Sequence, residues 1–337
     1  MRRLRSSLPI SIALVGVACA FLLGNAVQLE AEPSRAHLQG AKSLETAFVQ
    51  VYRTVSPSVV QIETGTGLGS GIVLDGKGDI VTNAHVVGSA KTFQVTTSSG
   101  KRLEAKLVGR FVEDDLAVIK VSGGNPGPAA RFADSNQLRV GDISFAIGNP
   151  LGLQSSFTQG VVSALGRDTP EGNGVTLRNA IQTSAAINPG NSGGALVDLD
   201  GRVIGIPTLA ASDPQMGGAA PGIGFAIPSS DVRDYARQIV QHGHVVNSHR
   251  AYLGIRIGQT AAGVYVGAVT PGGPAAKAGI RVGDVIAAID GQPTPTADAL
   301  GAALAAKKPG QTVAVKIIRQ SGKRETVHVR LGQLPGS

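Results

Sequence analysis

A serine enclosed by glycines, in the segment 188–195 (NPGNSGGA), constrains this chain more than any other feature. The flanking glycines leave the Ser192 hydroxyl and the neighbouring amides open to a substrate. Serine is a weak nucleophile at neutral pH, so a catalytic role requires a base to take its proton and a third group to orient that base. His85, which ends the run IVTNAH, and Asp115, which opens the run DLAVIK, are the candidates for these two roles.

The chain order His85, Asp115, Ser192, with separations of 30 and 77 residues, is typical of chymotrypsin-like proteases. The G-x-S-x-G pattern of α/β-hydrolases is also satisfied, and that fold is the alternative. It requires a helix directly after the serine, whereas residues 195–206 contain two short β-type runs joined by an Asp-Gly pair, which predicts a hairpin. It would also place the histidine after the serine, and no later histidine ends a convincing strand.

Length and composition favour two β-rich domains. The 337 residues are 42% hydrophobic, which suffices for two cores, and 46 glycines, 18 prolines and no tryptophan favour short strands joined by tight turns. The only cysteine, Cys19, can form neither an internal disulfide nor a thiolate metal site in the remainder. We expect a mainly β fold, a chymotrypsin-like double β-barrel followed by a smaller α+β domain, with an N-terminal apolar helix.

The N-terminus has the pattern of an export signal. Arg2, Arg3 and Arg5 precede the apolar stretch 8–27, which is long enough to span a bilayer. We therefore expect residues 1–30 to be a signal anchor in the inner membrane, with a cleaved signal peptide as the alternative. The arginines would keep the N-terminus cytoplasmic and place the rest of the chain in the periplasm or cell envelope.

The predicted catalytic residues fall in two successive series of strands. After a tether at 31–42, residues 43–241 are expected to form the protease-type domain, beginning with a helix at 43–52 whose N-cap is Ser43. The domain closes with a helix that Ser229 or Ser230 can cap and that reaches about residue 241. Since the histidine and aspartate lie in the first series and the serine in the second, the site would lie between two barrels.

At these residues the chain resembles the HtrA (Deg) family of chymotrypsin-fold serine proteases carrying one PDZ domain. The matching strings are GSGIV at 69–73, TNAHVV at 82–87, DLAV at 115–118, AIGNP at 146–150, QGVV at 159–162, QT at 182–183, AAINPGNSGG at 185–194 and GIGFAIP at 222–228. The resemblance implies a cofactor-independent endopeptidase acting on unfolded or exposed segments, in protein quality control or a stress response. It also selects Asp115 over Asp114, a choice that spacing leaves open.

Further residues are predicted to form the oxyanion hole and the substrate pocket. We expect the Gly190 and Ser192 amides to form the oxyanion hole, since a glycine two residues before the serine lets its amide face an oxyanion. Ile187, Ile223 and Phe225 would flank the primary substrate pocket. Because all three are apolar, we predict cleavage after small or medium aliphatic residues.

One position departs from the family pattern. The family usually has an acidic residue before the AAINP string, where this chain has Ser184. The missing carboxylate could alter how the activation loop is held. The alternative function is therefore a binding or chaperone-like protein whose protease domain is largely silent.

A second unit is expected at 251–335, after a linker at 242–250. It resembles a PDZ domain, in which Tyr252, Leu253, Gly254 and Ile255 match the carboxylate-binding loop, so that a peptide C-terminus would bind backbone amides and add a strand to the sheet edge. The alternative is a scaffold PDZ domain whose groove is occluded.

The distribution of charged and aromatic residues indicates which classes of partner the chain can bind. From residue 251 onward there are ten Lys or Arg and four Asp or Glu, which gives +6 of the total net charge of +8. The basic residues are scattered and aromatics are few, which argues against nucleic acid and favours peptide carboxylates or an anionic membrane surface. His242, His244 and His249 lack acidic or cysteine companions, so no metal is expected.

A homotrimer is the predicted assembly. In proteins of the resembled family, aromatic side chains before the first barrel meet around a three-fold axis, and Phe48 and Tyr52 lie four residues apart on one helical face. The alternative is that both rings attach this helix to their own barrel.

Overall fold

The computed structural model describes residues 35–65, 67–149, 156–172, 175–188, 190–213, 218–260 and 263–335. The predicted apolar segment at 8–27 lies outside the described residues, as does the start of the predicted tether. Within the described ranges, no helix combines the length and the apolar character that crossing a membrane requires. The chain divides into two compact units, 1–48 and 49–337, which are described separately.

Helix α2 (Arg35–Val55) contains all the described residues of the first unit and the first residues of the second. It begins earlier than the predicted helix at 43–52, so most of the predicted tether is helical and Ser43 lies inside the helix rather than at its N-cap. The preceding residues include alanine, leucine, glutamine and lysine, which have high helix propensity and therefore extend the helix beyond the stretch marked by apolar spacing.

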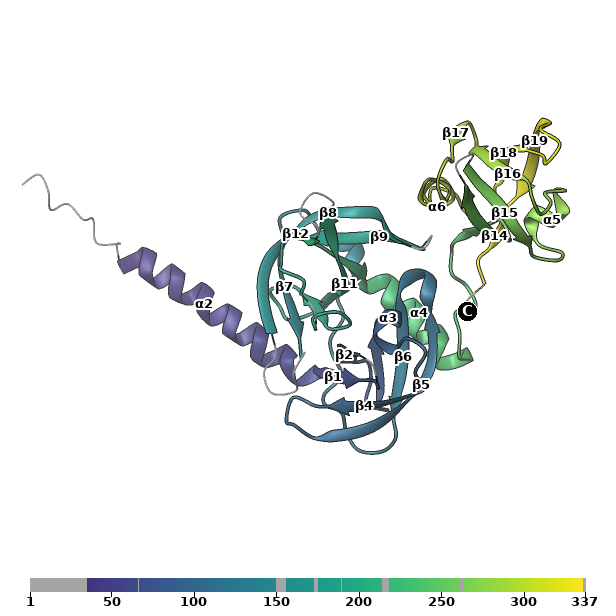
Figure 1. Cartoon of the computed structure of the whole chain (residues 1–337). Coiled ribbons are helices and arrows are strands. Elements are labelled where there is room, and N and C mark those ends of the chain that lie inside the picture. The colour runs from purple at the N-terminus through teal and green to yellow at the C-terminus, as the bar shows by residue number, and fades with distance from the viewer. Residues whose placement is uncertain are drawn as a thin grey trace, which may run out of the picture. The chain divides into compact units, whose positions relative to one another are not determined.

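The second unit begins with a closed barrel in the order β1-β2-β3-β6-β5-β4 (Figure 1). Its strands are β1 (Val59–Glu63), β2 (Leu68–Val73), β3 (Asp79–Thr82), β4 (Thr92–Thr96), β5 (Arg102–Phe111) and β6 (Leu116–Val121). Short helices η1 (Ser56–Ser58), α3 (Ala84–Val87) and η2 (Val112–Asp114) lie before or between them. Apolar side chains from these strands fill the barrel as one cluster that includes Ile62, Ile80 and Ile119.

A second closed barrel has the order β10-β11-β12-β9-β8-β7, and the predicted double barrel is thereby confirmed. Its strands are β7 (Ile143–Gly148), β8 (Ser156–Gly172), β9 (Val175–Thr183), β10 (Ala195–Val197), β11 (Val203–Asp213) and β12 (Gly218–Pro228), with η3 (Ser135–Gln137) before them. The hairpin predicted after the nucleophile is present: β10 pairs with β11 through a turn in which Gly201 has φ 70°. A helix after Ser192, as the α/β-hydrolase alternative requires, is absent from these described residues.

Helix α4 (Ser229–His242) closes the barrel region. It buries Val232, Tyr235 and Ile239 and contacts strands of both barrels, β5 and β6 on one side and β11 and β12 on the other. It ends at Gly243, whose φ of 78° lies in the left-handed region that glycine adopts without steric cost.

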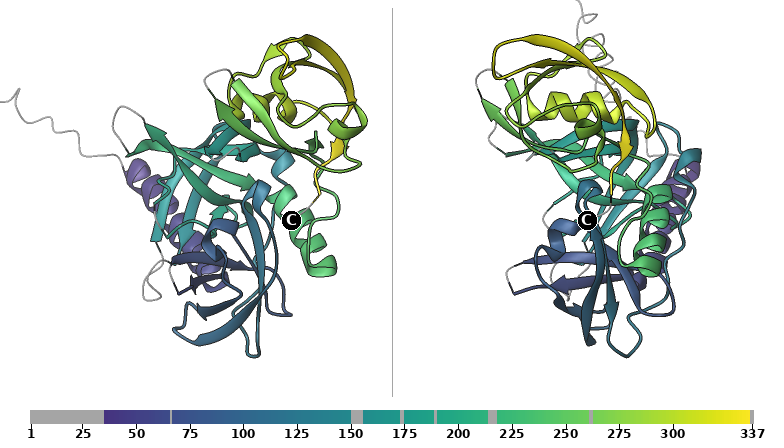
Figure 2. Two further views of the ribbon diagram at one scale, coloured as in Figure 1. Left: turned by 45° about the vertical axis from the view of Figure 1, so that its right-hand side comes forward. Right: turned by 90° about the vertical axis from the view of Figure 1, so that its right-hand side faces the viewer.

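The C-terminal module has its own core. Its sheet has the order β14-β15-β16-β18-β19, β17 pairs with β16, and β13 pairs with β20. The elements are β13 (Ala251–Tyr252), β14 (Ile255–Thr260), β15 (Gly263–Val269), α5 (Pro274–Lys277), β16 (Val285–Ile289), β17 (Gln292–Pro293), α6 (Ala297–Ala305), β18 (Thr312–Ile318), β19 (Arg324–Arg330) and β20 (Gly332–Gln333). Figure 2 shows α6 lying against this sheet, where Leu300 and Ala303 join the module's core cluster.

Candidate active site

The first barrel supplies a histidine and an aspartate that are joined by two hydrogen bonds. Strand β3 ends at Thr82, and the one-turn helix α3 that follows presents His85. His85 Nδ1 lies 2.7 Å from Asp115 Oδ2, and the His85 backbone amide donates to Asp115 Oδ1 at 2.8 Å. The carboxylate therefore fixes both the backbone and the ring of the histidine, which is the arrangement that orients a catalytic base.

Asp115 is itself held from several sides. It lies between η2 and β6 in the left-handed region, with φ 50° and ψ 40°. Its carbonyl accepts hydrogen bonds from the Ala84 amide and the Asn83 side-chain amide, each at 3.0 Å. Its side chain is only 6% exposed, against 50% for His85, so the pair has a buried carboxylate beneath an accessible imidazole.

The second barrel adds a residue that the sequence argument did not identify. Thr208, on β11, donates its hydroxyl hydrogen to Asp115 Oδ2, and its carbonyl accepts from Ser192 Oγ at 3.3 Å. One threonine thus contacts both the aspartate and the serine. Nothing in the sequence near residue 208 indicates this role, because it depends on the approach of two barrels.

The backbone around Ser192 follows a course that requires glycine. Gly190 has φ 104° and Gly193 has φ 78°. A Cβ on Gly193 would lie 2.2 Å from the Ser70 carbonyl oxygen, so no larger residue fits there. The Gly193 amide donates to Pro207 O at 3.0 Å and is thereby occupied within the protein. This occupation is in keeping with the prediction that Gly190 and Ser192 supply the oxyanion donors.

The segment before the nucleophile is attached to strand β8. The Ala186 carbonyl accepts from Thr158 Oγ1 at 2.8 Å and from Asn191 Nδ2 at 3.3 Å. At the position of the departure from the family pattern, Ser184 Oγ accepts from the Val161 amide at 3.0 Å, and the Ser184 amide donates to Val161 O at 3.0 Å. The serine therefore takes part in fixing this segment without a carboxylate.

The three predicted pocket residues have different surroundings. Ile187 and Phe225 are 9% and 7% exposed, whereas Ile223 is 37% exposed. Ile187 belongs to the core cluster of the second barrel and lies against Gly224, where an added Cβ would come within 2.4 Å of Ile187 Cγ1. The structure thus brings Ile187 against Gly224, the neighbour of Phe225 on β12, and Ile223 lies at the surface.

A buried ion pair lies directly beside Asp115 in the chain. Arg250, in the linker, donates from Nη1 to Asp114 Oδ1 at 2.8 Å and to the Glu113 carbonyl. Burial raises the pKa of Asp114 to about 6, against the opposing effect of the Arg250 charge. Burial also raises the pKa of Tyr235, whose hydroxyl donates to Ser248 O at 3.0 Å. Asp114 thus has a structural role, and Asp115 the position beside the histidine.

The loop Tyr252–Ile255 presents backbone amides to an open sheet edge. The Leu253 carbonyl accepts from the Ala275 amide at 2.8 Å, and the Gly254 carbonyl accepts from the Thr270 amide at 2.9 Å. Because C=O and N–H of a trans peptide point in opposite directions, the Gly254 and Ile255 amides face away from these partners. Strand β14 is at the edge of its sheet, so these amides lie where an added strand and its carboxylate would bind.

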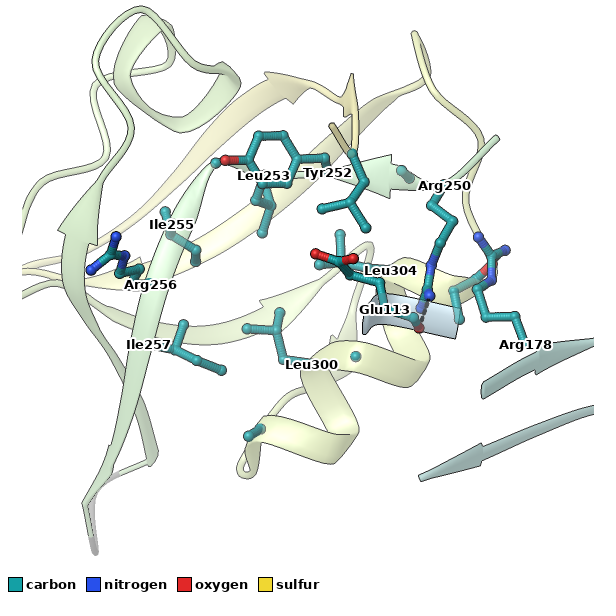
Figure 3. Close-up of a pocket in the computed structure, with 16 residues that line it drawn as sticks. Glu113, Arg178, Arg250, Tyr252, Leu253, Ile255, Arg256, Ile257, Leu300 and Leu304 are labelled. Carbon is teal, nitrogen blue, oxygen red and sulfur yellow. Dashed lines mark hydrogen bonds between the residues drawn. The ribbon is translucent and has the colours of Figure 1, made fainter. Parts of the chain in front are cut away.

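An apolar groove of about 490 Å³ adjoins this loop (Figure 3). Leu253, Ile255 and Ile257 line one side and Leu300 and Leu304 of α6 the other. Its lining also includes Glu113, Arg178 and Arg250. The groove can accommodate an apolar side chain next to the loop amides. The described part of the chain contains no group of three or more His, Cys, Asp or Glu side chains that could hold a metal ion.

Comparison with known proteins identifies both modules. A trypsin-like peptidase domain matches residues 69–206, and a PDZ domain matches residues 251–331. The periplasmic serine endoprotease DegP of Salmonella typhimurium is 42% identical over 277 residues, which are 79% of this chain and 57% of that protein. The serine protease PepD of Mycobacterium tuberculosis is 39% identical over 333 residues, which are 92% of this chain and 70% of that protein. The chain therefore spans less than two thirds of DegP.

Solved structures give the same result. A serine endoprotease from Yersinia pestis is 35% identical, with a TM-score of 0.58 over 85% of this chain and 98% of that chain. The HtrA-type protease AlgW, solved with a decapeptide, is 31% identical, with a TM-score of 0.58 over 86% of this chain and 99% of that chain.

Proposed function

Because this chain belongs to the HtrA-type family of serine proteases, we propose that it is a serine endopeptidase that cleaves unfolded or exposed protein segments in the cell envelope. The observation that carries the proposal is the 2.7 Å contact between His85 Nδ1 and Asp115 Oδ2, together with Thr208, which contacts both Asp115 Oδ2 and Ser192 Oγ. Asp115, His85 and Ser192 then have the roles of orienting group, base and nucleophile.

The chemistry proceeds through an acyl-enzyme. His85 Nε2 takes the Ser192 proton as Oγ attacks the scissile carbonyl, and later gives a proton to the leaving amine. Asp115 holds the Nδ1–H tautomer and stabilises the imidazolium. The Gly190 and Ser192 amides donate to the oxyanion, a contribution of about 10²–10³ in kcat for each donor in enzymes of this chemistry. Water attacks the acyl-enzyme in the second half of the reaction with His85 again as base.

The primary pocket accepts small or medium aliphatic side chains in this proposal. The pocket has apolar walls from Ile187, which lies against Gly224, and from Phe225. No acidic side chain among them would attract a basic residue. Sequencing of casein fragments should therefore show mostly Val, Ala or Ile before the cut. A majority of Lys or Arg at that position would contradict the assignment of the pocket.

The PDZ domain is proposed to bind the C-termini of peptides and thereby to regulate proteolysis. The outward direction of the Gly254 and Ile255 amides and the apolar groove between β14 and α6 support this binding mode. A free C-terminal peptide ending in an apolar residue should bind, and its C-terminal amide should bind much more weakly, because the amide lacks the carboxylate that the loop receives.

Membrane attachment through residues 8–27 and a homotrimer complete the proposal. The Tyr52 ring meets the Phe157 ring of its own barrel edge-on, with centroids 5.9 Å apart, so this aromatic residue does contact its own barrel. A trimer would therefore rely mainly on Phe48 and the rest of α2. Light scattering on residues 31–337 should give three times the monomer mass, and Phe48→Ala should lower it. A monomer at micromolar concentration would exclude the trimer.

Digestion of casein tests the central proposal. Wild-type protein should degrade unfolded β-casein, and Ser192→Ala should lower turnover by roughly 10⁴ to 10⁶ while the protein remains folded. If Ser192→Ala digests casein at the wild-type rate, the nucleophile is wrong. If the wild type is inactive but suppresses aggregation of unfolded casein, the chaperone-like alternative holds.

A further inference from the structure

Ser70 of β2 lies fully buried at the junction of the two barrels, 0% exposed. Its backbone amide donates to the Ser192 carbonyl at 3.0 Å, and its own carbonyl accepts from Thr82 Oγ1 at 2.6 Å. Its hydroxyl donates to the Gly190 carbonyl at 2.5 Å and accepts from the Asn149 amide at 2.7 Å. A single residue of the first barrel thus binds the carbonyls on both sides of Asn191.

These two contacts bear on the direction of the proposed oxyanion donors. Gly190 has φ 104°, a conformation that only glycine adopts readily, and a glycine can rotate its peptide planes more freely than any other residue. Fixing the Gly190 and Ser192 carbonyls restricts the peptide planes between them. The Ser192 amide lies in one of these planes. The Gly190 amide adjoins them across the Gly190 Cα, so the Ser70 hydroxyl fixes one of the two peptide planes that meet at this glycine.

Contacts with other residues hold the rest of the loop, so the Gly190 carbonyl stays within reach of the Ser70 hydroxyl. Asn191 is held by its side chain, which accepts from the Ser156 hydroxyl and donates to Ala186 O. A Cβ on Gly148 would lie 2.6 Å from the Gly190 carbonyl oxygen, which shows how closely the end of β7 approaches the loop. The first barrel contributes the remaining restraint through Ser70.

We propose that Ser70 is a positioning residue for the oxyanion hole, whose hydroxyl holds the Gly190 carbonyl so that the Gly190 and Ser192 amides point at the developing oxyanion. This inference rests on the proposed function. Ser70 does not touch the substrate, and it acts through the loop. Removal of its hydroxyl leaves a buried acceptor on Gly190 and a buried donor on Asn149 without their partner, which favours rotation of the Gly190 peptide.

Ser70→Ala tests the role, and Ser229→Ala is a matched control. Ser229 is also 0% exposed and donates its hydroxyl to a backbone carbonyl, Ala133 O at 2.8 Å, outside the active site. With a peptide substrate, Ser70→Ala should lower kcat about 10- to 100-fold and leave KM within about twofold. Affinity for a peptide boronate, which forms a tetrahedral adduct on Ser192, should fall by the same factor as kcat. Ser229→Ala should leave kcat, KM and boronate affinity within about twofold of wild type.

Ser70→Cys, which keeps the size but donates weakly, should give intermediate losses in kcat and boronate affinity, and it decides the question if Ser70→Ala does not fold. The proposal is overturned if Ser70→Ala loses no more kcat than Ser229→Ala, or if kcat falls while boronate affinity stays at the wild-type value. Activity of Ser192→Ala at the wild-type rate would instead overturn the proposed function itself, whatever Ser70→Ala does.

Discussion

The two barrels contribute to the active site in different ways. In the first barrel, one aspartate binds the ring and the backbone of His85 and, through its carbonyl, the two residues before it, so the pair is built from neighbouring segments of a single barrel. In the second barrel, the loop that carries Ser192 is held by contacts from elsewhere: Ser70 of the first barrel, and β8 through Thr158 and Ser156.

The loop that carries Ser192 is therefore the part of the site that can be regulated. The bonds between the histidine and the aspartate lie within the first barrel, and the second barrel adds only the Thr208 hydroxyl to the same carboxylate. The nucleophile loop depends on contacts between separate strands, so its geometry can change while both barrels stay intact. Changes at the histidine and the aspartate should therefore act through the chemistry of the base. Changes around the loop, including those at Ser70, should act through the direction of its amides.

The largest expected effect comes from breaking the first-barrel pair. Asp115→Asn keeps the size of the side chain but presents an amide to His85 Nδ1, which favours the wrong tautomer and should lower kcat about 10⁴-fold. Peptide hydrolysis by the purified variant measures this. Asp79→Asn is the control, because Asp79 is equally buried in the same barrel and pairs with Lys120 at 2.8 Å, away from the site. Equal losses for the two variants would show a general effect on the barrel.

Much of the fold was predictable from sequence, because the proposed catalytic residues lie in short contiguous patterns. The order of His85, Asp115 and Ser192, the glycines around the serine and the hairpin after it predicted a double barrel, and the two closed barrels confirm that fold. The choice of Asp115 over Asp114 came from the family resemblance. The structure supplies a physical counterpart, since Asp114 is engaged by Arg250.

The supporting residues were not predictable in the same way. Ser70 and Thr208 act across the junction of two barrels, and no local pattern marks a serine or threonine that will meet a distant carbonyl or carboxylate. The start of α2 was also misplaced, because apolar spacing marks only the part of a helix that packs, whereas helix propensity extends it to Arg35. The different exposure of Ile223 and Phe225 depends on tertiary contacts in the same sense.

A second prediction concerns the coupling of the first barrel to the linker. Burial raises the pKa of Asp114 to about 6, while Asp231 raises it further and Arg250, Tyr235 and Arg178 lower it. Because the folded-state pKa is raised, the folded state binds the Asp114 proton more tightly than the unfolded state does. This contribution to folding stability is complete below about pH 3.8 and is lost as the pH rises through about 6. At 1.36 kcal/mol for each pKa unit, the change from 3.8 to about 6 corresponds to about 3 kcal/mol in all, of which the titration of Asp114 should cost the wild type about 2 kcal/mol between pH 4 and 7.

Urea unfolding checks this, with Ser192→Ala as the background to prevent self-digestion. Asp114→Asn lacks the titrating group. Its unfolding free energy should therefore rise relative to that of its background as the pH rises from 4 to 7. A difference that stays constant over that range would show that Asp114 does not titrate there.

A smaller effect is expected at Thr208, through which the second barrel supports the base. Thr208→Val removes the hydroxyl that donates to Asp115 Oδ2 and keeps the shape and the carbonyl that accepts from Ser192. A hydrogen bond to a charged group contributes about 1.5–3 kcal/mol, so kcat should fall about 10- to 100-fold. The control is Thr294→Val, which removes a buried hydroxyl bonded to Ile286 O at 3.1 Å in the PDZ domain. Equal kcat in Thr208→Val and wild type would remove Thr208 from the catalytic support.

The smallest effect is expected where the chain departs from its family. Ser184 is exposed and its hydroxyl accepts from the Val161 amide at 3.0 Å, so Ser184→Ala loses one solvent-accessible hydrogen bond of about 0.5–1.5 kcal/mol. The bond from Thr158 to Ala186 O and the backbone bond from Ser184 to Val161 O remain, and they keep the segment attached to β8. We therefore expect kcat/KM to fall by no more than about tenfold in peptide hydrolysis. Ser163→Ala, on β8, should show no change, because its hydroxyl bond to Val161 O is long, at 3.4 Å. A loss as large as that of Asp115→Asn would mean that Ser184 alone holds the activation segment, and the second barrel would then depend on a single exposed hydroxyl.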